Sequence, residues 1–405
     1  MICHNTLRAR PRQEFGADAF PVKILILTWK DPGDPEAGGN EVTLLELARR
    51  LAGQGHSVTW LTRRFPGVSC EERRQGIRFV RIGGKWTVYF QAYRFYRRLQ
   101  DKPDVVVDVI NVAGWLTPLY VREPILVWAN QIVDQVFFCQ WPFLLAHLGR
   151  YCERFQYRWY RDVPMLCYSP SVRKDLEDVG IPGGNILPIP LGVDHQRYWP
   201  GAKSGTPLFV CVSRLANWKR IDACIRAMPE VCRKHPTAKL VVVGKGPAGA
   251  RLKRLVAQLR LAGRIEFEDQ NVFFYEPCPA DRKIPLLQQS WALLQMSIKE
   301  GWGLTISEAN ACGTLAIVSG APGLRDNVRH MHTGLVLAEH PTTEEIARAM
   351  CLIIENPALR AELEGHAVQS ASRLDWRRSA ETLESYLFRV APRARPNLGA
   401  VPRNP

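Results

Sequence analysis

Residues 300–313 read EGWGLTISEANACG, a glycine-broken loop that runs into a short helix-compatible segment. A turn of this kind offers backbone N–H groups to a phosphate at the start of a helix. The helix dipole there contributes roughly 0.3–1 kcal/mol per anionic group. Glu300 and Glu308 add acceptors for hydroxyl groups on either side of the loop. The stretch therefore predicts a site for a phosphorylated ligand with hydroxyl groups, unless both carboxylates only favour a helix N-terminus electrostatically.

The segments around this stretch predict an open α/β unit, because apolar runs typical of buried strands alternate with amphipathic helical segments. The expected strands are 208–212, 239–243, 265–268, 292–296, 315–318 and 334–337. The expected helices are 221–234, 250–261, 283–289, 343–354, 361–370 and 376–389. Ligands of such sheets bind at the carboxyl ends of the strands, and Glu300 closely follows one of these ends.

A similar α/β unit is predicted earlier in the chain. Strand 22–28, a loop containing DPGDPEAGGN, helix 41–51 and strand 57–62 form a βαβ unit of a parallel sheet. The pattern continues with strands 77–81, 104–110, 125–129, 164–168 and 185–190. The helices expected between them are 87–99, 137–160 in two pieces around Pro142, and 171–179. The fold class is therefore α/β, with two similar-sized halves that face each other across a cleft.

The prolines and glycines of residues 192–206 predict a linker between the halves. We expect domains at 22–195 and 196–372. Residues 1–21 are predicted to be a disordered extension. Residues 392–405, rich in proline and arginine, are predicted to be a disordered tail.

Basic and glycine residues follow other strands at the same edge of the cleft. Arg214 and Lys219 come just after strand 208–212, and an arginine fork with a lysine point charge is a common pair at phosphates. The alternative is a solvated basic loop. Gly38 and Gly39 stand before a predicted helix, where glycine lets the backbone approach a ligand closely.

Composition limits the classes of function. The formal net charge of +15 favours anionic partners, namely nucleic acid, an acidic membrane or phosphorylated substrates. No apolar run is long enough to span a bilayer. The eleven cysteines form no C-x-x-C pair, so we expect a reduced, cytoplasmic compartment and no metal site.

Five segments in order, VSRLANWKRIDACIRA, VVVGKGP, EGWGLTISEANACGT, PGLRDNV and HTGLVL, resemble retaining glycosyltransferases of the GT-B fold, family 4. The GGNE loop at 38–41 and the LGVDHQRY segment match the same family. The resemblance covers residues 22–387. It implies two Rossmann-like domains, a nucleotide diphosphate sugar as donor, and no cofactor or metal. It also implies that a C-terminal helix, 373–391, returns to the first domain.

The resemblance also implies roles for individual residues. Glu300 would contact hydroxyls of the transferred sugar and support the charge that develops at its anomeric carbon. Glu308 would hold the ribose, while Arg214 and Lys219 would neutralise the leaving diphosphate. The remaining donor-binding residues would line the sugar and phosphates, and they are Gly38, Gly39, Gly301, Trp302, Gly303 and Leu304.

One departure from the family concerns residues 125–133, where many relatives carry one or two histidines facing the reacting sugar. This chain has Asn130 and Val133 there. Asn130 can donate a hydrogen bond but cannot shuttle a proton, so it is a catalytic candidate of a different kind. Asp108 and Asn111 are candidates for the acceptor side, with loop capping as the equal alternative.

The sequence leaves the acceptor open, as a glycan, a lipid-linked molecule or a small molecule. The aromatic and basic segments 87–99 and 137–160 predict either core packing or peripheral contact with an anionic membrane. Nucleic-acid binding has no motif in its support. Two other functions remain: another GT-B activity, such as a phosphorylase or a sugar-nucleotide epimerase, and a non-catalytic nucleotide-sugar binder.

Overall fold

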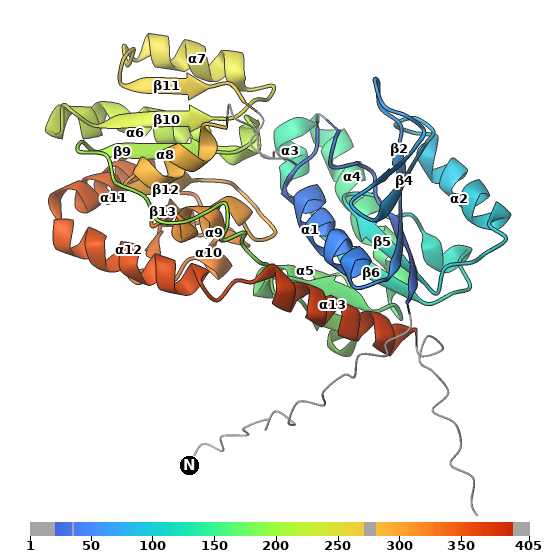
Figure 1. The fold of residues 1–405 in the computed structure, drawn as a ribbon. Coiled ribbons are helices and arrows are strands. Elements are labelled where there is room, and N and C mark those ends of the chain that lie inside the picture. The colour runs from blue at the N-terminus through green and yellow to red at the C-terminus, as the bar shows by residue number, and fades with distance from the viewer. Residues whose placement is uncertain (1–20, 35, 271–280, 392–405) are drawn as a thin grey trace, which may run out of the picture.

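The computed structural model describes residues 21–34, 36–270 and 281–391 and shows two α/β units, each built on its own sheet (Figure 1). The predicted extension and tail therefore lie almost wholly outside the described residues. Both sheets are covered by helices, so their central strands are buried on both faces and read as continuous apolar runs. This confirms the predicted α/β class.

The first sheet has eight strands in the order β3-β4-β2-β1-β5-β6-β7-β8. Their bounds are β1 Lys23–Leu27, β2 Ser57–Arg63, β3 Glu71–Arg74, β4 Ile77–Ile82, β5 Val105–Ile110, β6 Ile125–Ala129, β7 Met165–Cys167 and β8 Ile186–Pro188. All pairs are parallel except β3 with β4. The helices of this unit are α1 Gly39–Gly53, α2 Val88–Arg98, α3 Val136–Gln140, α4 Phe143–Gln156 and α5 Pro170–Asp178, with short 3-10 turns η1 Thr117–Leu119, η2 Tyr157–Tyr160 and η3 Gly183–Asn185.

The second sheet has six parallel strands in the order β11-β10-β9-β12-β13-β14. They are β9 Leu208–Val212, β10 Lys239–Val243, β11 Ile265–Glu268, β12 Ala292–Gln295, β13 Leu315–Val318 and β14 Gly334–Val336. The helices are α6 Ile221–Lys234, α7 Gly249–Gln258, α8 Lys283–Gln289, α9 Leu304–Ala311, α10 Leu324–Asn327, α11 Thr343–Glu355, α12 Pro357–Ala371 and α13 Trp376–Val390, with the 3-10 turn η4 Asn217–Lys219.

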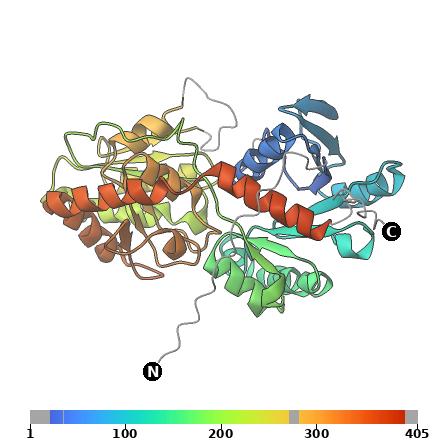
Figure 2. The ribbon, with the colours of Figure 1, turned by 60° about the horizontal axis from the view of Figure 1, so that its bottom comes forward.

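Helix α13 leaves the second unit and packs on the first, as Figure 2 shows in red. Trp376, Leu383 and Leu387 join the apolar core formed by β1, β2 and α1. His56 accepts a hydrogen bond from the Val22 N–H at Nδ1 (3.0 Å) and meets Glu384 of α13 through Nε2 (2.9 Å). The helix therefore closes the core of the first unit.

Two details of the fold differ from the sequence-based expectation. The antiparallel strand β3 was missed, because its sequence EERR is polar, but the left-handed turn at Gln75 and Gly76 returns it onto β4. Helix α12 begins at Pro357, four residues before the predicted start, because proline suits the first turn of a helix.

The order of strands reverses at β1/β5 in the first sheet and at β9/β12 in the second. Loops that leave neighbouring strands in opposite directions open a crevice at such a point. The loops after β1 and after β9 and β12 contain Gly38, Arg214 and Glu300, respectively. The topology thus brings these three predicted residues to the edges of the cleft.

Candidate functional site

A cavity of about 210 Å³ lies between the two units and is lined by residues of both. The first unit contributes the loop after β1, the starts of the loops after β5 and β6, and Tyr168. The second contributes the loop after β9 and residues 300–305. Of the predicted site residues, the cavity wall contains Gly38, Gly39, Asn111, Asn130, Arg214, Lys219, Glu300, Gly301, Trp302, Gly303 and Leu304.

The Glu300 carboxylate in this wall has three side-chain partners. Its Oε1 forms an ion pair with Lys219 Nζ and accepts hydrogen bonds from Gln295 Nε2 (3.1 Å) and Ser297 Oγ (2.7 Å). The Glu300 and Lys219 side chains are only 12% and 11% exposed. Burial lowers the pKa of Lys219, and the nearby Glu300 carboxylate partly offsets this by raising the pKa. The pair thus places one negative and one positive group, both poorly hydrated, at the cavity wall.

The PGLRDNV segment holds the Glu300 loop from behind. The Glu300 N–H donates to the Pro322 carbonyl (3.1 Å), and Asn327 Nδ2 donates to the carbonyls of Trp302 and Gly303 (3.1 Å each). Helix α9 starts at Leu304 and has no side-chain cap at Gly303. Its first N–H groups therefore lie beside the cavity, where an anion can bind.

Substitution of Gly323, in the PGLRDNV segment, tests how this segment supports the Glu300 loop. Its φ is +83°, and a Cβ there would meet the Glu300 carbonyl oxygen at 2.0 Å. Gly67 has φ +82° with nothing within 4 Å of its Cβ position, so it is a matched control. We expect Gly67→Ala to cost about 1 kcal/mol of unfolding free energy from the left-handed backbone alone. Gly323→Ala should cost about 2–4 kcal/mol, because rigid backbone must also move.

Thermal and denaturant unfolding of both variants measure this difference. Gly323→Ala should also weaken nucleoside diphosphate binding, since the Glu300 loop must shift to admit the methyl group. Equal stability and equal binding in the two variants would contradict the supporting role of Gly323.

The glycine loop of the first unit is tied down on both sides. The buried Glu41 accepts a hydrogen bond from the Gly38 N–H (2.7 Å), and burial raises the pKa of this carboxyl. From the opposite unit, Arg214 donates to the carbonyls of Glu36 (2.5 Å) and Ala37 (3.3 Å). The guanidinium therefore bridges the two units directly beside the glycines.

Asn130 meets the Glu300 loop from the first unit. The Tyr168 hydroxyl donates to its carbonyl and its side-chain oxygen. A Cβ at Gly301 would lie 2.6 Å from that hydroxyl and 2.8 Å from the Asn130 carbonyl oxygen. Only glycine at position 301 allows this approach. The next turn is held by Glu153, which accepts from the N–H groups of Val133 (2.8 Å) and Asp134 (3.1 Å) and whose pKa burial raises to about 7.

Two predicted site residues, Asp108 and Glu308, are absent from the cavity wall, as is Val133 at one of the expected histidine positions. Asp108 is fully buried and accepts from Thr117 Oγ1 (2.7 Å) and Tyr160 Oη (2.7 Å), which favours its loop-capping alternative. Glu308 pairs with Lys283 (2.7 Å) and lines a separate, smaller cavity that shares Leu304. Val133 is positioned by Glu153, away from the wall.

The sequence reasoning missed several lining residues, including Lys30, Tyr168 and Gln295. Lys30 and Tyr168 follow the ends of β1 and β7 closely, so the rule that located Glu300 would have found them. Lys30 adds a third cation beside Arg214 and Lys219, although burial lowers its pKa. Gln295 belongs to a strand, and nothing in the sequence marks it as a lining residue.

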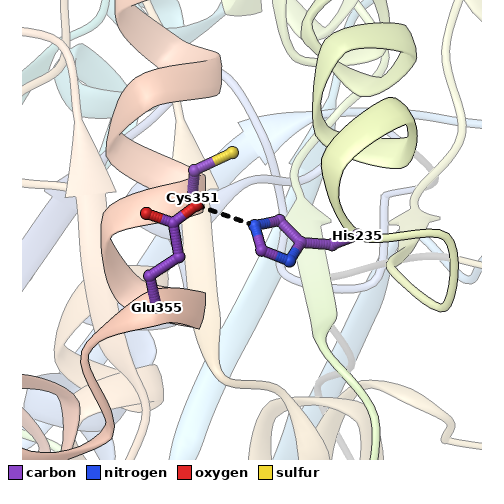
Figure 3. A group of neighbouring side chains, drawn as sticks. All are labelled: His235, Cys351 and Glu355. Carbon is purple, nitrogen blue, oxygen red and sulfur yellow. Dashed lines mark hydrogen bonds and ion pairs between the residues drawn. The ribbon is translucent and has the colours of Figure 1, made fainter.

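Among the described residues, one group of side chains that could hold a metal ion lies outside the cleft. His235, at the end of α6, contacts Glu355 of α11 (3.0 Å), and Cys351 lies one turn before Glu355 (Figure 3). Their ligand atoms lie within 4.8 Å of one another. The sequence did not reveal this group, because its members come from segments far apart in the chain. Cys351 belongs to the apolar core and burial raises its pKa, so a buried thiol beside a surface ion pair accounts for the group.

Two family models match the chain in succession. The model described as Glycosyltransferase Family 4 matches residues 37–197, and the model described as glycosyl transferases group 1 matches residues 197–369. The D-inositol 3-phosphate glycosyltransferase of Acidothermus cellulolyticus is 32% identical over 396 residues, 86% of this chain and 85% of that protein. The Nocardia farcinica protein of the same name is 30% identical over 231 residues, 54% of this chain, and the match spans 51% of its length.

Solved structures show the same fold at low sequence identity. Sucrose-phosphate synthase from Thermosynechococcus elongatus superposes with a TM-score of 0.75 at 19% identity, covering 92% of this chain and all of that chain. The Anabaena protein HepE, solved in complex with UDP and glucose, superposes with a TM-score of 0.70 at 17% identity, covering 91% of this chain and all of that chain. Both family models and the Acidothermus relative agree with this fold, and the chain belongs to the GT-B glycosyltransferases of family 4, glycosyl transferases group 1.

Proposed function

We propose that the protein transfers a sugar from a nucleotide diphosphate sugar to an acceptor, with retention of the anomeric configuration and without a metal ion. The single observation that carries the proposal is the convergence of Glu300, Lys219, Arg214 and the start of α9 on one interdomain cavity. A carboxylate beside two cations suits a substrate that has both hydroxyl groups and a diphosphate.

In this proposal the bond between the anomeric carbon and the diphosphate oxygen breaks, and the diphosphate keeps the electron pair. Arg214, Lys219 and the α9 N–H groups stabilise that negative charge, which a metal ion does in other transferases. The Glu300 carboxylate stabilises the positive charge at the anomeric carbon. The acceptor oxygen attacks from the face that the diphosphate leaves, and its proton passes to the departing phosphate oxygen.

Asn130 is proposed to contact the reacting sugar from the first unit. Its side-chain oxygen already accepts from Tyr168, so its amide N–H groups remain as donors. Burial raises the pKa of Tyr168 well above its usual value, so this hydroxyl stays protonated. Asn111, which lines the same wall, is proposed to lie on the acceptor side.

Glu308 is proposed to hold the ribose once the donor is bound. It lies one turn after Leu304 on α9, and Leu304 lines both its cavity and the main one. The Lys283 ion pair would have to yield a carboxylate oxygen to the ribose hydroxyls. We also propose a cytoplasmic location, in keeping with thiols used as core residues, such as Cys167 and Cys211.

The Acidothermus and Nocardia relatives are named D-inositol 3-phosphate glycosyltransferases. The acceptor of this chain stays open among glycans, lipid-linked molecules and small molecules. Another GT-B activity or a non-catalytic binder are the competing functions. The replacement of the expected histidines by Asn130 and Val133 is the observation that favours a binder.

A donor-hydrolysis screen tests the proposal, because hydrolysis needs no knowledge of the acceptor. We expect slow release of nucleoside diphosphate from one or more nucleotide sugars, and a metal chelator should not affect the rate. At the earliest times the released sugar should have the same anomeric configuration as the donor. Phosphorolysis without transfer would favour a phosphorylase. Tight donor binding with no turnover would favour the binder, and neither binding nor turnover across the panel would reject the proposal.

A further inference from the structure

Large apolar side chains are exposed along one part of the first unit, formed by α3, α4 and η2. We name this surface the α3–α4 face. Its exposed members are Phe138, Trp141, Phe143, Leu144, Leu145, Leu148, Tyr151, Phe155 and Trp159. Ring contacts connect them, from Phe138 to Phe143 (6.2 Å between centroids), from Tyr151 to Phe155 (5.7 Å) and from Phe155 to Trp159 (5.4 Å). A cluster of exposed apolar side chains of this kind marks an interaction site.

Helix α4 contacts the rest of the protein along a narrow stripe. Its buried residues are Ala146, Glu153 and Gln156. The exposed Leu144, Leu148, Tyr151 and Phe155 follow the helical repeat and form a second stripe. Leu144 is 79% exposed and Leu148 is 57% exposed. The core therefore uses one side of the helix and leaves an apolar side uncovered.

Arginines outnumber acids within α3, α4 and η2. Within residues 136–161, all of which the structure describes, Glu153 is the sole acid, and it is buried beneath the helix. Arg150 is exposed but pairs with Asp134, and Asp162 is exposed just after η2. Arg158 is exposed too, and its guanidinium lies 4.8 Å from the Phe155 ring and 5.7 Å from the Trp159 ring. Arginine above aromatic rings keeps its charge in water while its stem covers apolar surface.

The α3–α4 face begins beside the cleft. Helix α3 packs against η4, which carries Lys219, and Figure 1 shows α3 on the side of the first unit that faces the second. Asn130, in the cavity wall, lies six residues before the start of α3. A large body bound to this face would therefore sit next to the entrance of the cavity.

We propose that the α3–α4 face docks on the surface of an anionic lipid bilayer. The chain's net charge of +15 and the arginines of the face are complementary to acidic head groups, while the aromatic and leucine side chains suit the interfacial region. Among the described residues no helix is long and apolar enough to cross a bilayer, so the contact is peripheral. A second copy suits the face less, because a two-fold interface would set its arginines against each other.

Helix α2 also has exposed aromatic residues beside it and on it, but it is not part of the α3–α4 face. Val88, Ala92 and Tyr96 of this helix are buried, and Tyr89 and Phe95 pack against the apolar core. Trp86 and Phe90 remain exposed, but the proposal does not depend on them. It also goes beyond the proposed transfer reaction and does not rest on it.

Vesicle flotation of the full chain tests the proposal. We expect binding to vesicles of phosphatidylcholine with phosphatidylglycerol, and much weaker binding to phosphatidylcholine alone or at high salt. Leu144→Glu with Leu148→Glu should weaken binding at least roughly tenfold, and Arg158→Ala about fivefold. Met331→Glu, at an exposed apolar residue of the second unit, should bind like the unchanged protein.

Unchanged unfolding temperature and unchanged nucleoside diphosphate affinity of the double variant would show that the loss is local. The proposal is overturned if the unchanged protein does not bind anionic vesicles, or if the double variant binds them as well as Met331→Glu does. It is also overturned if sedimentation shows that the unchanged protein is a dimer that does not bind vesicles, and that the double variant is a monomer. A protein that binds vesicles but hydrolyses no donor would reject the proposed function and leave this inference intact.

Discussion

Replacing Glu300 by glutamine should lower kcat for donor hydrolysis and transfer roughly 10²–10³-fold. The amide keeps the shape of the side chain and can still accept from Gln295 and Ser297. It removes the negative charge that stabilises the anomeric carbon in the transition state, so the loss should appear in kcat rather than in donor affinity. Single-turnover assays with the best donor of the screen measure the change.

The same variant should alter how binding depends on pH. Burial lowers the pKa of Lys219, and the Glu300 carboxylate is the largest influence that raises it again. Without this carboxylate the pKa of Lys219 falls further, and only the protonated ammonium attracts the diphosphate. Nucleoside diphosphate affinity should therefore start to decline at a lower pH in Glu300→Gln than in the unchanged protein.

Glu266→Gln is the matched control, because Glu266 also pairs with a lysine, Lys239 (3.3 Å), but on the surface. It should leave kcat and the pH profile of binding unchanged. A Glu300→Gln enzyme with full kcat would remove Glu300 from the reaction. An identical pH profile would show that the pKa of Lys219 does not depend on the charge of Glu300.

Most of the site edge was predictable because parallel strands impose it. Strands β9 and β12 read as continuous apolar runs, and whatever follows their carboxyl ends must meet at one crevice. Arg214, Lys219 and Glu300 all follow this rule, as does Gly38 after β1. Local pattern and topology together were sufficient to bring these residues into one cavity.

The remaining features depend on tertiary contacts that have no local sequence signal. Asp108 looks like a polar residue at a strand end, but the return of the chain at Thr117 and Tyr160 buries it. Glu308 shares a helix with the cavity residues, yet Lys283 draws it to a neighbouring cavity. The exposure of α4 was also undecided, because an aromatic stripe on a helix suits core and surface equally until the neighbours are known.

Replacing Lys219 by methionine should weaken nucleoside diphosphate binding roughly 10- to 100-fold, the range expected for one charge-assisted contact. Methionine keeps the length of the side chain and its contact with the Trp218 ring, over which the ammonium lies at 4.0 Å. The Glu300 carboxylate keeps its bonds from Gln295 and Ser297. Calorimetric titration measures the loss, and Lys239→Met, at an exposed ion pair, is the control that should bind normally.

The same variant should change how stability depends on pH. Because burial lowers the pKa of Lys219 below 10.5, the folded protein binds this proton less tightly than the unfolded chain does. The charged lysine thus costs stability at every pH below its folded pKa, and the cost disappears as the pH rises to 10.5. Methionine removes this pH-dependent cost but leaves the Glu300 carboxylate without its cation. Relative to the unchanged protein, its unfolding temperature should therefore be most favourable at neutral pH and become less favourable in alkaline solution. A loss of stability with unchanged diphosphate affinity would instead make Lys219 a structural partner of Glu300.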